Sequence, residues 1–253
     1  MAPGRRGGAA PVRIPCIADD RGSFRMSAHT VTPGSVPVKG AATAFAVHRI
    51  YCVGKNYAAH AREMGADPAR EAPTFFCKPH DAVVPGGGDV PYPPRTQNLH
   101  HEVELVVAIG RGGADIPVGE ALSHVYGYAL GNDLTRRDLQ TAAKNAGQPW
   151  DTGKAFDCSA PITAITPVSA GGHVSKGRIW LTVNGELRQQ ADVADMTWDV
   201  PHIIAELSTY FRLQPGDLIF TGTPAGVGAL KRGDVVDSGI DGFERLAFRI
   251  GQG

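Results

Sequence analysis

The amino-acid sequence predicts a β-rich α+β domain with only a few helices. Turn residues are dense, because the 253 residues include 32 Gly and 19 Pro. The apolar runs between them are short and rich in β-branched and aromatic side chains, which favours strands over long helices. With 42% hydrophobic residues, the chain can bury a sizeable core as one domain, with or without an appendage.

Strands are expected wherever a short run of this kind lies between turn signals. The predicted strands cover residues 45–53, 74–77, 103–109, 126–130, 178–183, 186–188, 218–221 and 246–250. Asn184 and Gly185 separate two of them. They predict a tight hairpin, because both central positions of its turn need a positive φ.

Three helices are predicted. Asp199 is a good N-cap with Pro201 in the first turn. The apolar residues that follow recur at helical spacing and are expected to pack in the core: Ile203, Ile204, Leu207, Tyr210 and Phe211. A second helix is predicted over residues 135–145, capped by Thr135 and with Asp138 at its third position. A short third helix is predicted over residues 57–64.

The charge balance argues against two classes of partner. Lys and Arg total 25 and so do Asp and Glu, so no overall field attracts nucleic acid or an anionic membrane. No apolar run approaches the roughly 18 residues of a membrane span. The four cysteines show no Cys-x-x-Cys spacing, so reduced thiols and a cytoplasmic protein are the simplest expectation.

Residues 1–40 are expected to form a disordered N-terminal extension, and residues 41–253 the folded domain. Residues 1–25 are rich in Gly, Pro and Arg and lack the apolar stretch of a secretory signal. A weak basic targeting peptide, or an initiation site at Met26, are the alternatives for this segment.

Glu102, Glu104 and Asp133 form a candidate metal site. The two glutamates are one residue apart in a strand-like run, so they would project from the same face. Asp133 follows the next apolar run. Carboxylates this close repel unless a cation neutralises them, and an all-oxygen set suits Mg²⁺ or Mn²⁺ better than Zn²⁺. The alternative is an exposed strand with scattered charges.

His60 and Glu63 form a candidate general-base dyad. Residues three apart share a helix face, so the carboxylate could orient the imidazole for activating water. An ordinary surface pair is the alternative.

Three further features could face the same site, each with a plainer alternative. Lys154 has apolar neighbours and could be a partly buried cation, or an exposed lysine. Gln140 follows Asp133 on the predicted helix and could face the same cavity or solvent. The loop 221–228 (TGTPAGVG) could hold a carboxylate through backbone N–H groups, or be a tight turn. Nucleotide-driven chemistry is not expected, because P-loop and dinucleotide fingerprints are incomplete.

In combination, these motifs resemble the fumarylacetoacetate hydrolase family. The segments that carry the resemblance are 51–57 (YCVGKNY) with His60 and Glu63, 76–79 (FCKP), 100–105 (HHEVEL), Asn132-Asp133 with Gln140, Lys154, and 221–228. The similarity runs from about Arg49 to Ile250. It is greatest to the short acylpyruvate hydrolase branch, which includes bacterial fumarylpyruvate hydrolases of aromatic catabolism.

The resemblance implies a rolled mixed β-sandwich with a few peripheral helices, a homodimer, and a role for each candidate residue. Glu102, Glu104 and Asp133 would bind the divalent metal. The catalytic residues would be His60, Glu63, Gln140 and Lys154. The substrate contacts would be Lys55, Lys78, Gly222 and Thr223. Lys55 stands where many family members carry Arg, and lysine cannot fork onto a carboxylate as arginine does.

The reaction implied is hydrolytic carbon–carbon cleavage of a 2,4-dioxo acid, to pyruvate and a carboxylic acid. Water activated by His60 would attack the distal carbonyl, and pyruvate would leave as an enolate stabilised by the metal and Lys154. The alternatives on the same scaffold are oxaloacetate decarboxylation and the isomerisation or decarboxylation of 2-oxo-dienoates. A carboxylate-binding protein without catalysis is disfavoured, since binding alone requires no base.

Overall fold

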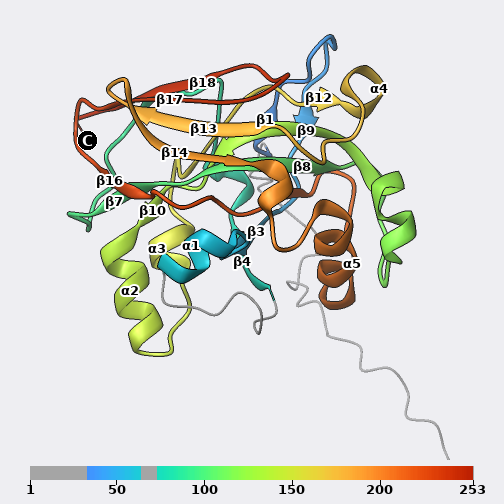
Figure 1. Ribbon diagram of the computed structural model, residues 1–253, viewed down its shortest axis with the longest axis horizontal. Coiled ribbons are helices and arrows are strands. Elements are labelled where there is room, and N and C mark those ends of the chain that lie inside the picture. The colour runs from blue at the N-terminus through green and yellow to red at the C-terminus, as the bar shows by residue number, and fades with distance from the viewer. Residues whose placement is uncertain (1–32, 64–72, 253) are drawn as a thin grey trace, which may run out of the picture. The chain divides into compact units, whose positions relative to one another are not determined.

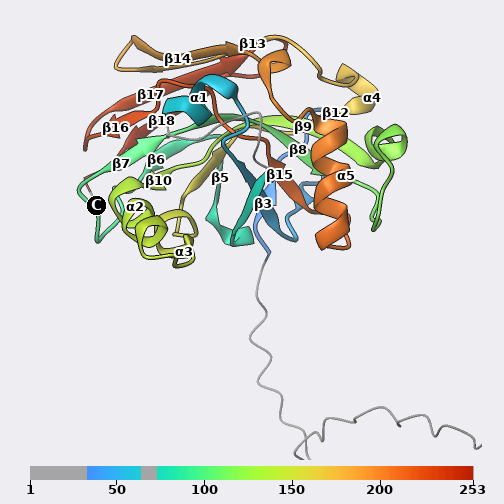
Figure 2. The same cartoon turned by 60° about the horizontal axis from the view of Figure 1, so that its bottom comes forward.

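A computed structural model describes residues 33–63 and 73–252, with side chains described except at residues 61–63. Its main body is two β-sheets packed face to face, with most of the helices at their ends (Figures 1 and 2). The predicted β-rich α+β class and the rolled mixed sandwich are confirmed. No helix within the described ranges is long and apolar enough to cross a membrane.

The larger sheet has eight strands and is mixed. Its order is β4 (Thr74–Lys78), β3 (Ile50–Gly54), β15 (Leu218–Phe220), β8 (Val103–Ile109), β9 (Val125–Asn132), β11 (Ala160–Ile162) and β5 (Val83–Pro85), with β12 (Thr166–Pro167) also paired to β9. The pairs β15–β3 and β11–β5 are parallel, and the other pairs are antiparallel.

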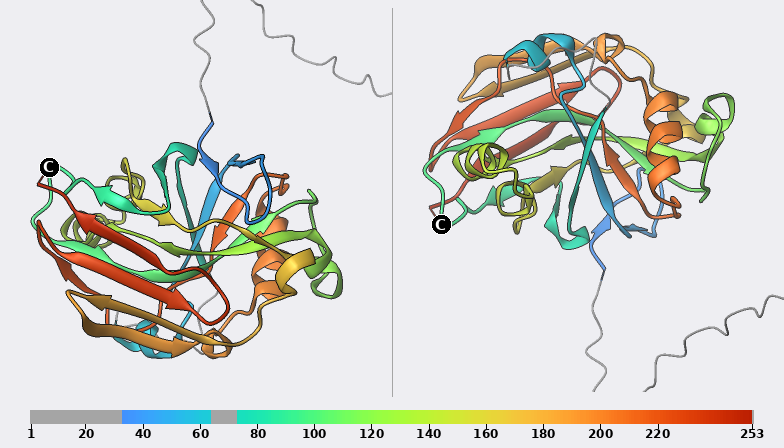
Figure 3. Two further views of the ribbon diagram at one scale, coloured as in Figure 1. Left: turned by 90° about the horizontal axis from the view of Figure 1, so that it is seen from above. Right: turned by 90° about the horizontal axis from the view of Figure 1, so that it is seen from below.

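The smaller sheet has five strands. Its order is β14 (Glu186–Asp192), β13 (Arg178–Val183), β17 (Val235–Ile240), β18 (Leu246–Ile250) and β6 (Gly88–Val90). The predicted hairpin joins β13 to β14, with φ of +52° at Asn184 and +82° at Gly185. Figure 3 shows the two layers from above and below.

Two minor sheets complete the strand set. One is β10 (Thr135–Arg136), β7 (Leu99–His101) and β16 (Gly228–Leu230), and the other is β1 (Ser35–Val36) with β2 (Phe45–Ala46). The strands β7 and β8 belong to different sheets and are separated only by Glu102. The chain therefore changes sheets at a predicted metal ligand.

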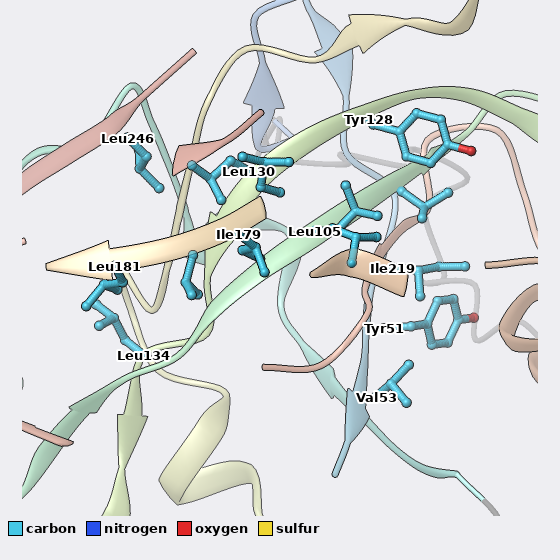
Figure 4. Packing of buried hydrophobic residues seen from close by; sticks show 14 of the residues in the cluster. Tyr51, Val53, Leu105, Tyr128, Leu130, Leu134, Ile179, Leu181, Ile219 and Leu246 are labelled. Atoms are coloured by element: carbon cyan, nitrogen blue, oxygen red, sulfur yellow. The ribbon is translucent and has the colours of Figure 1, made fainter. Parts of the chain in front are cut away.

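The core fills both faces of the larger sheet. Along β8, Leu105 and Val107 pack toward the smaller sheet, whereas Val106 and Ala108 join a second buried cluster on the opposite face. Figure 4 shows Leu105 beside Ile179 of the smaller sheet. Burial on both faces explains why the β8 run is almost continuously apolar.

The helices are short and peripheral. They are α1 (Ala58–Glu63), α2 (Arg137–Asn145), α3 (Asp151–Lys154), α4 (Val168–Gly171) and α5 (Val200–Tyr210), with 3₁₀ turns at His80–Ala82, Val118–His124 and Val193–Asp195. As predicted, the Asp199 side chain caps α5 by accepting from His202 N. Helices α2 and α3 lie at the opposite end of the sheets from α5 (Figures 1 and 2).

Three sequence predictions need correction. Tyr210 and Phe211 are 64% and 39% exposed and do not join the core, because α5 ends there. The predicted strand 45–53 is split into β2 and β3. Thr135 does not cap α2; it lies in β10, and its hydroxyl donates to Asp133 O at 2.9 Å.

The N-terminal boundary also moves. Residues 33–40 belong to the folded domain, because Ser35 and Val36 pair with residues of β2 and Val36 is fully buried. Lys39 N also donates to Ile165 O at 2.9 Å. Residues 1–32 lie outside the described residues, so the extension stays a prediction there.

Candidate metal centre and active-site cavity

The three predicted carboxylates converge on one buried point. Glu102, Glu104 and Asp133 are 4%, 2% and 1% exposed, and one oxygen of each lies within 4.8 Å of the others. Glu104 is in β8, where it pairs with Gly131 of the antiparallel neighbour β9. Asp133 follows the end of β9, so the strand pairing itself brings the two carboxylates together.

The position of Glu102 at the same point has a structural cause that was not predicted from the sequence. It lies between two strands instead of within one, and its backbone continues the pairing with the segment after β9. Its carbonyl accepts from Asp133 N at 2.8 Å, and its N–H donates to Asn132 Oδ1 at 3.1 Å. The prediction that Glu102 and Glu104 lie close together is therefore correct, but the two residues do not belong to one continuous strand.

Three buried cations surround these carboxylates. Lys154 Nζ donates to Glu102 Oε2 at 2.7 Å and to Asp133 Oδ2 at 2.6 Å. The Arg137 guanidinium pairs with Glu102 Oε1. Lys78 Nζ lies 2.8 Å from Asp133 Oδ1. The positive charges thus gather on Glu102 and Asp133, whereas Glu104 Oε2 accepts from the neutral N–H of Gly222 at 2.8 Å.

This arrangement shifts the pKa values of Glu102 and Glu104 in opposite directions. Burial opposes ionisation of Glu102, but Lys154 and Arg137 outweigh it and hold the pKa of that carboxyl well below its usual range. Burial, together with the negative charges of Asp133 and Glu102, raises the pKa of Glu104 well above its usual range. Burial opposes the charge on Lys154, yet Asp133 and Glu102 raise its pKa overall. Glu104 is the acid whose negative charge is least compensated.

The donor set fits a hard divalent cation. All three side chains offer oxygen, which Mg²⁺ and Mn²⁺ prefer. Asp133 Oδ1 is buried and accepts no hydrogen bond from the described residues, because Lys78 approaches it within ion-pair distance but without hydrogen-bond geometry. A cation at this point would occupy that oxygen and neutralise Glu104.

A cavity of about 430 Å³ opens above the carboxylates. Of the predicted residues, its lining includes the three carboxylates with Lys55, His60, Gln140, Lys154 and Thr223. The other lining residues are Val53, Gly54, Phe76, Arg137, Thr141, Lys144, Asn145 and Trp150. Segments far apart in the sequence therefore share one site, as the resemblance implied.

His60 lies on the cavity wall, in α1, and is only 4% exposed. Glu63 is the last residue of the same helix, but its side chain lies outside the described residues. The dyad therefore stays a prediction, and the structure adds that His60 belongs to the lining of the cavity that also includes the three carboxylates.

Two predicted substrate contacts occupy a different place. Lys78 does not line the cavity: its ammonium lies behind Asp133 and donates to Leu134 O at 3.1 Å and Lys154 O at 2.5 Å. Gly222 does not line it either, and its N–H holds Glu104. Both residues contact candidate metal ligands, and their contact with substrate stays a prediction.

Thr223 lines the cavity, but its hydroxyl has partners within the protein. The hydroxyl donates to Val103 O at 2.9 Å and accepts from Gln189 Nε2 at 2.8 Å. Gln189 Oε1 in turn lies 2.8 Å from His101 Nδ1. The glycine-rich loop is thus anchored on the strand that carries Glu104, which leaves backbone N–H groups as the expected donors to a carboxylate.

Arg137 is the main residue that the sequence did not reveal. It is only 8% exposed, and besides pairing with Glu102 it donates to Gln140 Oε1 at 2.6 Å. Burial, and then Arg137, lower the pKa of nearby His100 to about 4, so this imidazole is neutral and can accept from Arg137 Nε. The only signal for Arg137 in the sequence was its spacing of three residues from Gln140 on one helix face.

We expect Gly222→Ala to weaken metal binding about tenfold, as changes behind metal ligands commonly do. Gly222 has a φ of +98°, and an added Cβ would lie 2.6 Å from the Asn56 Cβ. The loop must therefore shift and loosen its bond to Glu104. Calorimetric titration with Mg²⁺ measures the effect. Gly233→Ala is the control, since Gly233 has a φ of +89° and no atom within 4 Å of an added Cβ. Equal affinities in the two variants would contradict the role of Gly222.

Comparison with known proteins agrees with the resemblance. Residues 49–251 match the family described as fumarylacetoacetate (FAA) hydrolase C-terminal. The chain is 44% identical over 201 residues to the mitochondrial oxaloacetate tautomerase of Rattus norvegicus, covering 79% of this chain and 90% of the relative. It is 45% identical over 185 residues to a fumarylpyruvate hydrolase of Ralstonia sp, covering 73% and 96%.

A solved structure is similar over nearly the whole described domain. The fumarylpyruvate hydrolase from Pseudomonas aeruginosa, in complex with Mn²⁺ and pyruvate, is 51% identical and superposes with a TM-score of 0.88. The match covers 89% of this chain and 99% of that one. From these matches and the site geometry, the chain belongs to the fumarylacetoacetate hydrolase C-terminal family.

Proposed function

We propose that this protein is a metal-dependent hydrolase that cleaves a carbon–carbon bond of a 2,4-dioxo acid. The substrate is an acylpyruvate, with fumarylpyruvate as the first candidate, and the products are pyruvate and a carboxylic acid. The observation that carries the proposal is the buried carboxylate cluster at the floor of a cavity that also holds His60 and Lys154. Relatives named fumarylpyruvate hydrolase, at 45% and 51% identity, support it.

Glu102, Glu104 and Asp133 would hold Mg²⁺ or Mn²⁺. The cation would supply Lewis acidity and a fixed anchor for the carboxylate and 2-keto oxygen of the substrate. Lys78 and Gly222 keep two of the ligands in place, and Arg137 does so for Glu102. The Mn²⁺ in the related structure supports a divalent ion of this kind.

Side chains of the protein would accept the proton from water and stabilise the negative charge that develops on the substrate. His60 accepts a proton from water, whose oxygen attacks the carbonyl carbon distal to the pyruvoyl end. The bond between this carbon and the methylene then breaks, and its electron pair becomes the enolate of pyruvate. Lys154 and the amide nitrogen of Gln140 stabilise that negative charge until the methylene carbon is protonated. Glu63 is proposed to orient His60.

A second candidate function acts on oxaloacetate. Relatives 41–44% identical to this chain are named oxaloacetate tautomerases. Enolisation of oxaloacetate needs the cation and groups that stabilise the enolate, but no attacking water. Oxaloacetate decarboxylation, and isomerisation or decarboxylation of 2-oxo-dienoates, require the same enolate stabilisation. A turnover screen with Mg²⁺ or Mn²⁺ over fumarylpyruvate, acetylpyruvate and oxaloacetate separates these reactions. Turnover of oxaloacetate alone would overturn the hydrolase proposal.

We also expect metal affinity to rise with pH. The pKa of Glu104 is raised in the metal-free protein. At pH values where an ordinary glutamate is ionised, this carboxyl therefore still holds a proton, which it must release to bind a cation. Affinity for Mg²⁺ should therefore keep increasing with pH above the ordinary titration range of a glutamate. Titrations in buffers of different ionisation enthalpy would detect the released proton. A flat affinity without proton release would contradict this expectation.

The cellular setting is part of the proposal. We propose a cytoplasmic homodimer that acts in the breakdown of aromatic compounds. The exposed aromatic pair Tyr210 and Phe211 supports self-association, because exposed aromatic clusters are typical of interfaces. Light scattering coupled to size-exclusion chromatography measures the oligomeric state, and a monomer at micromolar concentration would contradict it.

A further inference from the structure

Gln189 is a fully buried polar residue in a strand that is otherwise open to solvent. It is 0% exposed, whereas the other residues of β14 are exposed or half-buried. A buried amide is stable only where both of its ends find partners, because an unpaired buried donor or acceptor is costly. Gln189 does not line the active-site cavity. Any effect on the site must therefore pass through the residues that it contacts.

Four hydrogen bonds saturate this amide. Its Nε2 donates to Thr223 Oγ1 and to Pro224 O, both at 2.8 Å. Its Oε1 accepts from Val103 N at 3.2 Å and lies 2.8 Å from His101 Nδ1. Pro224 O can only accept and Val103 N can only donate, so the orientation of the amide is fixed. The proton between Oε1 and His101 must then belong to Nδ1 of the imidazole.

The two ends of the amide join the two segments that build the candidate metal centre. The oxygen end bonds to the residues on both sides of Glu102. The nitrogen end bonds to the glycine-rich loop (residues 221–228) directly after Gly222, whose N–H donates to Glu104. Gln189 is therefore a strut from the smaller sheet that fixes the distance between the ligand-bearing segment and this loop.

A β-bulge accompanies this placement of Gln189. Leu181 of β13 pairs with Gln189, and the next residue of β13 pairs with Leu187. Arg188 is thus the extra residue of the bulge. Bulges bend a strand, re-aim its side chains and are common beside active sites. The loop also packs closely on the bulge, because Gly226 has a φ of +95° and an added Cβ would overlap Arg188 O.

We propose that Gln189 is a positioning residue of the active site. It sets the glycine-rich loop against the ligand-bearing segment, so that Gly222 holds Glu104 and the backbone N–H groups of the loop keep one geometry for a substrate carboxylate. Because the loop begins beside Glu104, this carboxylate would be that of the keto-acid end, next to the cation. The inference rests on the proposed function for this role of the loop.

Gln189→Met tests the inference, because methionine has a similar volume but forms none of the four hydrogen bonds. Affinity for Mg²⁺ should fall about tenfold, as changes behind metal ligands commonly do, and the Mg²⁺-loaded protein should bind pyruvate more weakly by a similar factor. Calorimetric titrations well below the melting temperature measure both affinities. Gln190→Met is the matched control, since Gln190 is exposed on the same strand and accepts from Arg178. It should bind both ligands as the unmodified protein does.

Two further measurements separate positioning from a general loss of stability. In Gln189→Met, amide hydrogen exchange should accelerate about tenfold in residues 221–228 with little change in β9, because only the loop loses its support. With saturating Mg²⁺, KM for fumarylpyruvate should rise about tenfold while kcat changes much less. The reason is that the loop would hold the carboxylate equally in the ground state and in the transition state.

Gln189→Asn covers the case in which the methionine variant does not fold. Asparagine keeps a polar amide in the core but is one methylene too short to reach both segments, so the same losses of affinity are expected. Unchanged affinities for Mg²⁺ and pyruvate in a folded variant would overturn the inference. Exchange that accelerates uniformly along the chain would do so as well, because Gln189 would then contribute to stability alone.

Failure of the proposed function gives a different result. If both affinities depend on Gln189 while no acylpyruvate is cleaved, Gln189 is a positioning residue and the hydrolase assignment is wrong. If acylpyruvate is cleaved and Gln189→Met changes neither KM nor the two affinities, the hydrolase assignment stands and the positioning role is wrong.

Discussion

Glu104→Gln is expected to lower acylpyruvate cleavage by about 10³-fold or more, because the cation would lose a ligand together with its Lewis acidity. Glu104 is 2% exposed, and its carboxylate accepts a hydrogen bond from Gly222 N. One of its oxygens lies within 4.8 Å of oxygens of Glu102 and Asp133. Glutamine keeps the shape but offers only a neutral oxygen. The melting-temperature increase that Mg²⁺ gives the unmodified protein should disappear along with activity.

The metal-free variant separates this effect from simple unfolding. Burial and the neighbouring carboxylates already oppose a negative charge on Glu104, so a neutral amide there should let the metal-free Glu104→Gln protein melt no lower than the metal-free original. Glu120→Gln, at an exposed residue outside the cavity, should change neither property. Retained Mg²⁺ stabilisation in Glu104→Gln would exclude Glu104 as a ligand.

His60→Ala is expected to lower acylpyruvate cleavage by about 10²–10⁴-fold, which is the usual contribution of a positioned general base. His60 is buried on the cavity wall above the carboxylates, where an attacking water would have to be deprotonated. Metal affinity should change little, because His60 is outside the ligand set. Steady-state kinetics and a Mg²⁺ titration on the same preparation measure both properties.

Oxaloacetate provides the internal comparison for this variant. Decarboxylation needs no activated water, so any such activity should fall much less than hydrolysis in His60→Ala. His202→Ala, at an exposed histidine of α5, serves as the control. If hydrolysis survives His60→Ala, His60 and Glu63 do not act as a general-base dyad, and another group must be the base.

The sequence predicted what depends on local pattern. Short apolar runs rich in β-branched residues, bounded by turn residues, identified β8, β13 and their neighbours, and turn chemistry identified the Asn184-Gly185 turn, since residue composition and backbone φ preferences act over a few residues. The N-cap Asp199 was recognisable for the same reason. The apolar run at residues 45–53 was wrongly predicted as one strand, because the chain there leaves one small sheet and enters the large one.

For the candidate site too, residue identities were predictable from the sequence and contacts were not. The identity of the three carboxylates followed from residue type and spacing, and the combination of motifs indicated the family. What they touch could not be predicted in this way. Lys78 carries no local mark that places it behind Asp133, and Gly222 none that directs its N–H to Glu104, because these contacts join distant segments.

By itself, the sequence determined the β-rich class and pointed to the three clustered carboxylates and to His60 as a candidate base, because each is a matter of residue type at short range. Only the tertiary structure decided that Glu102 lies where the chain passes between sheets, that Arg137 pairs with it, and that segments far apart in the sequence line one cavity. These features depend on the pairing and register of strands far apart in the chain. Such pairing is settled by burial of the whole core and not by any one segment.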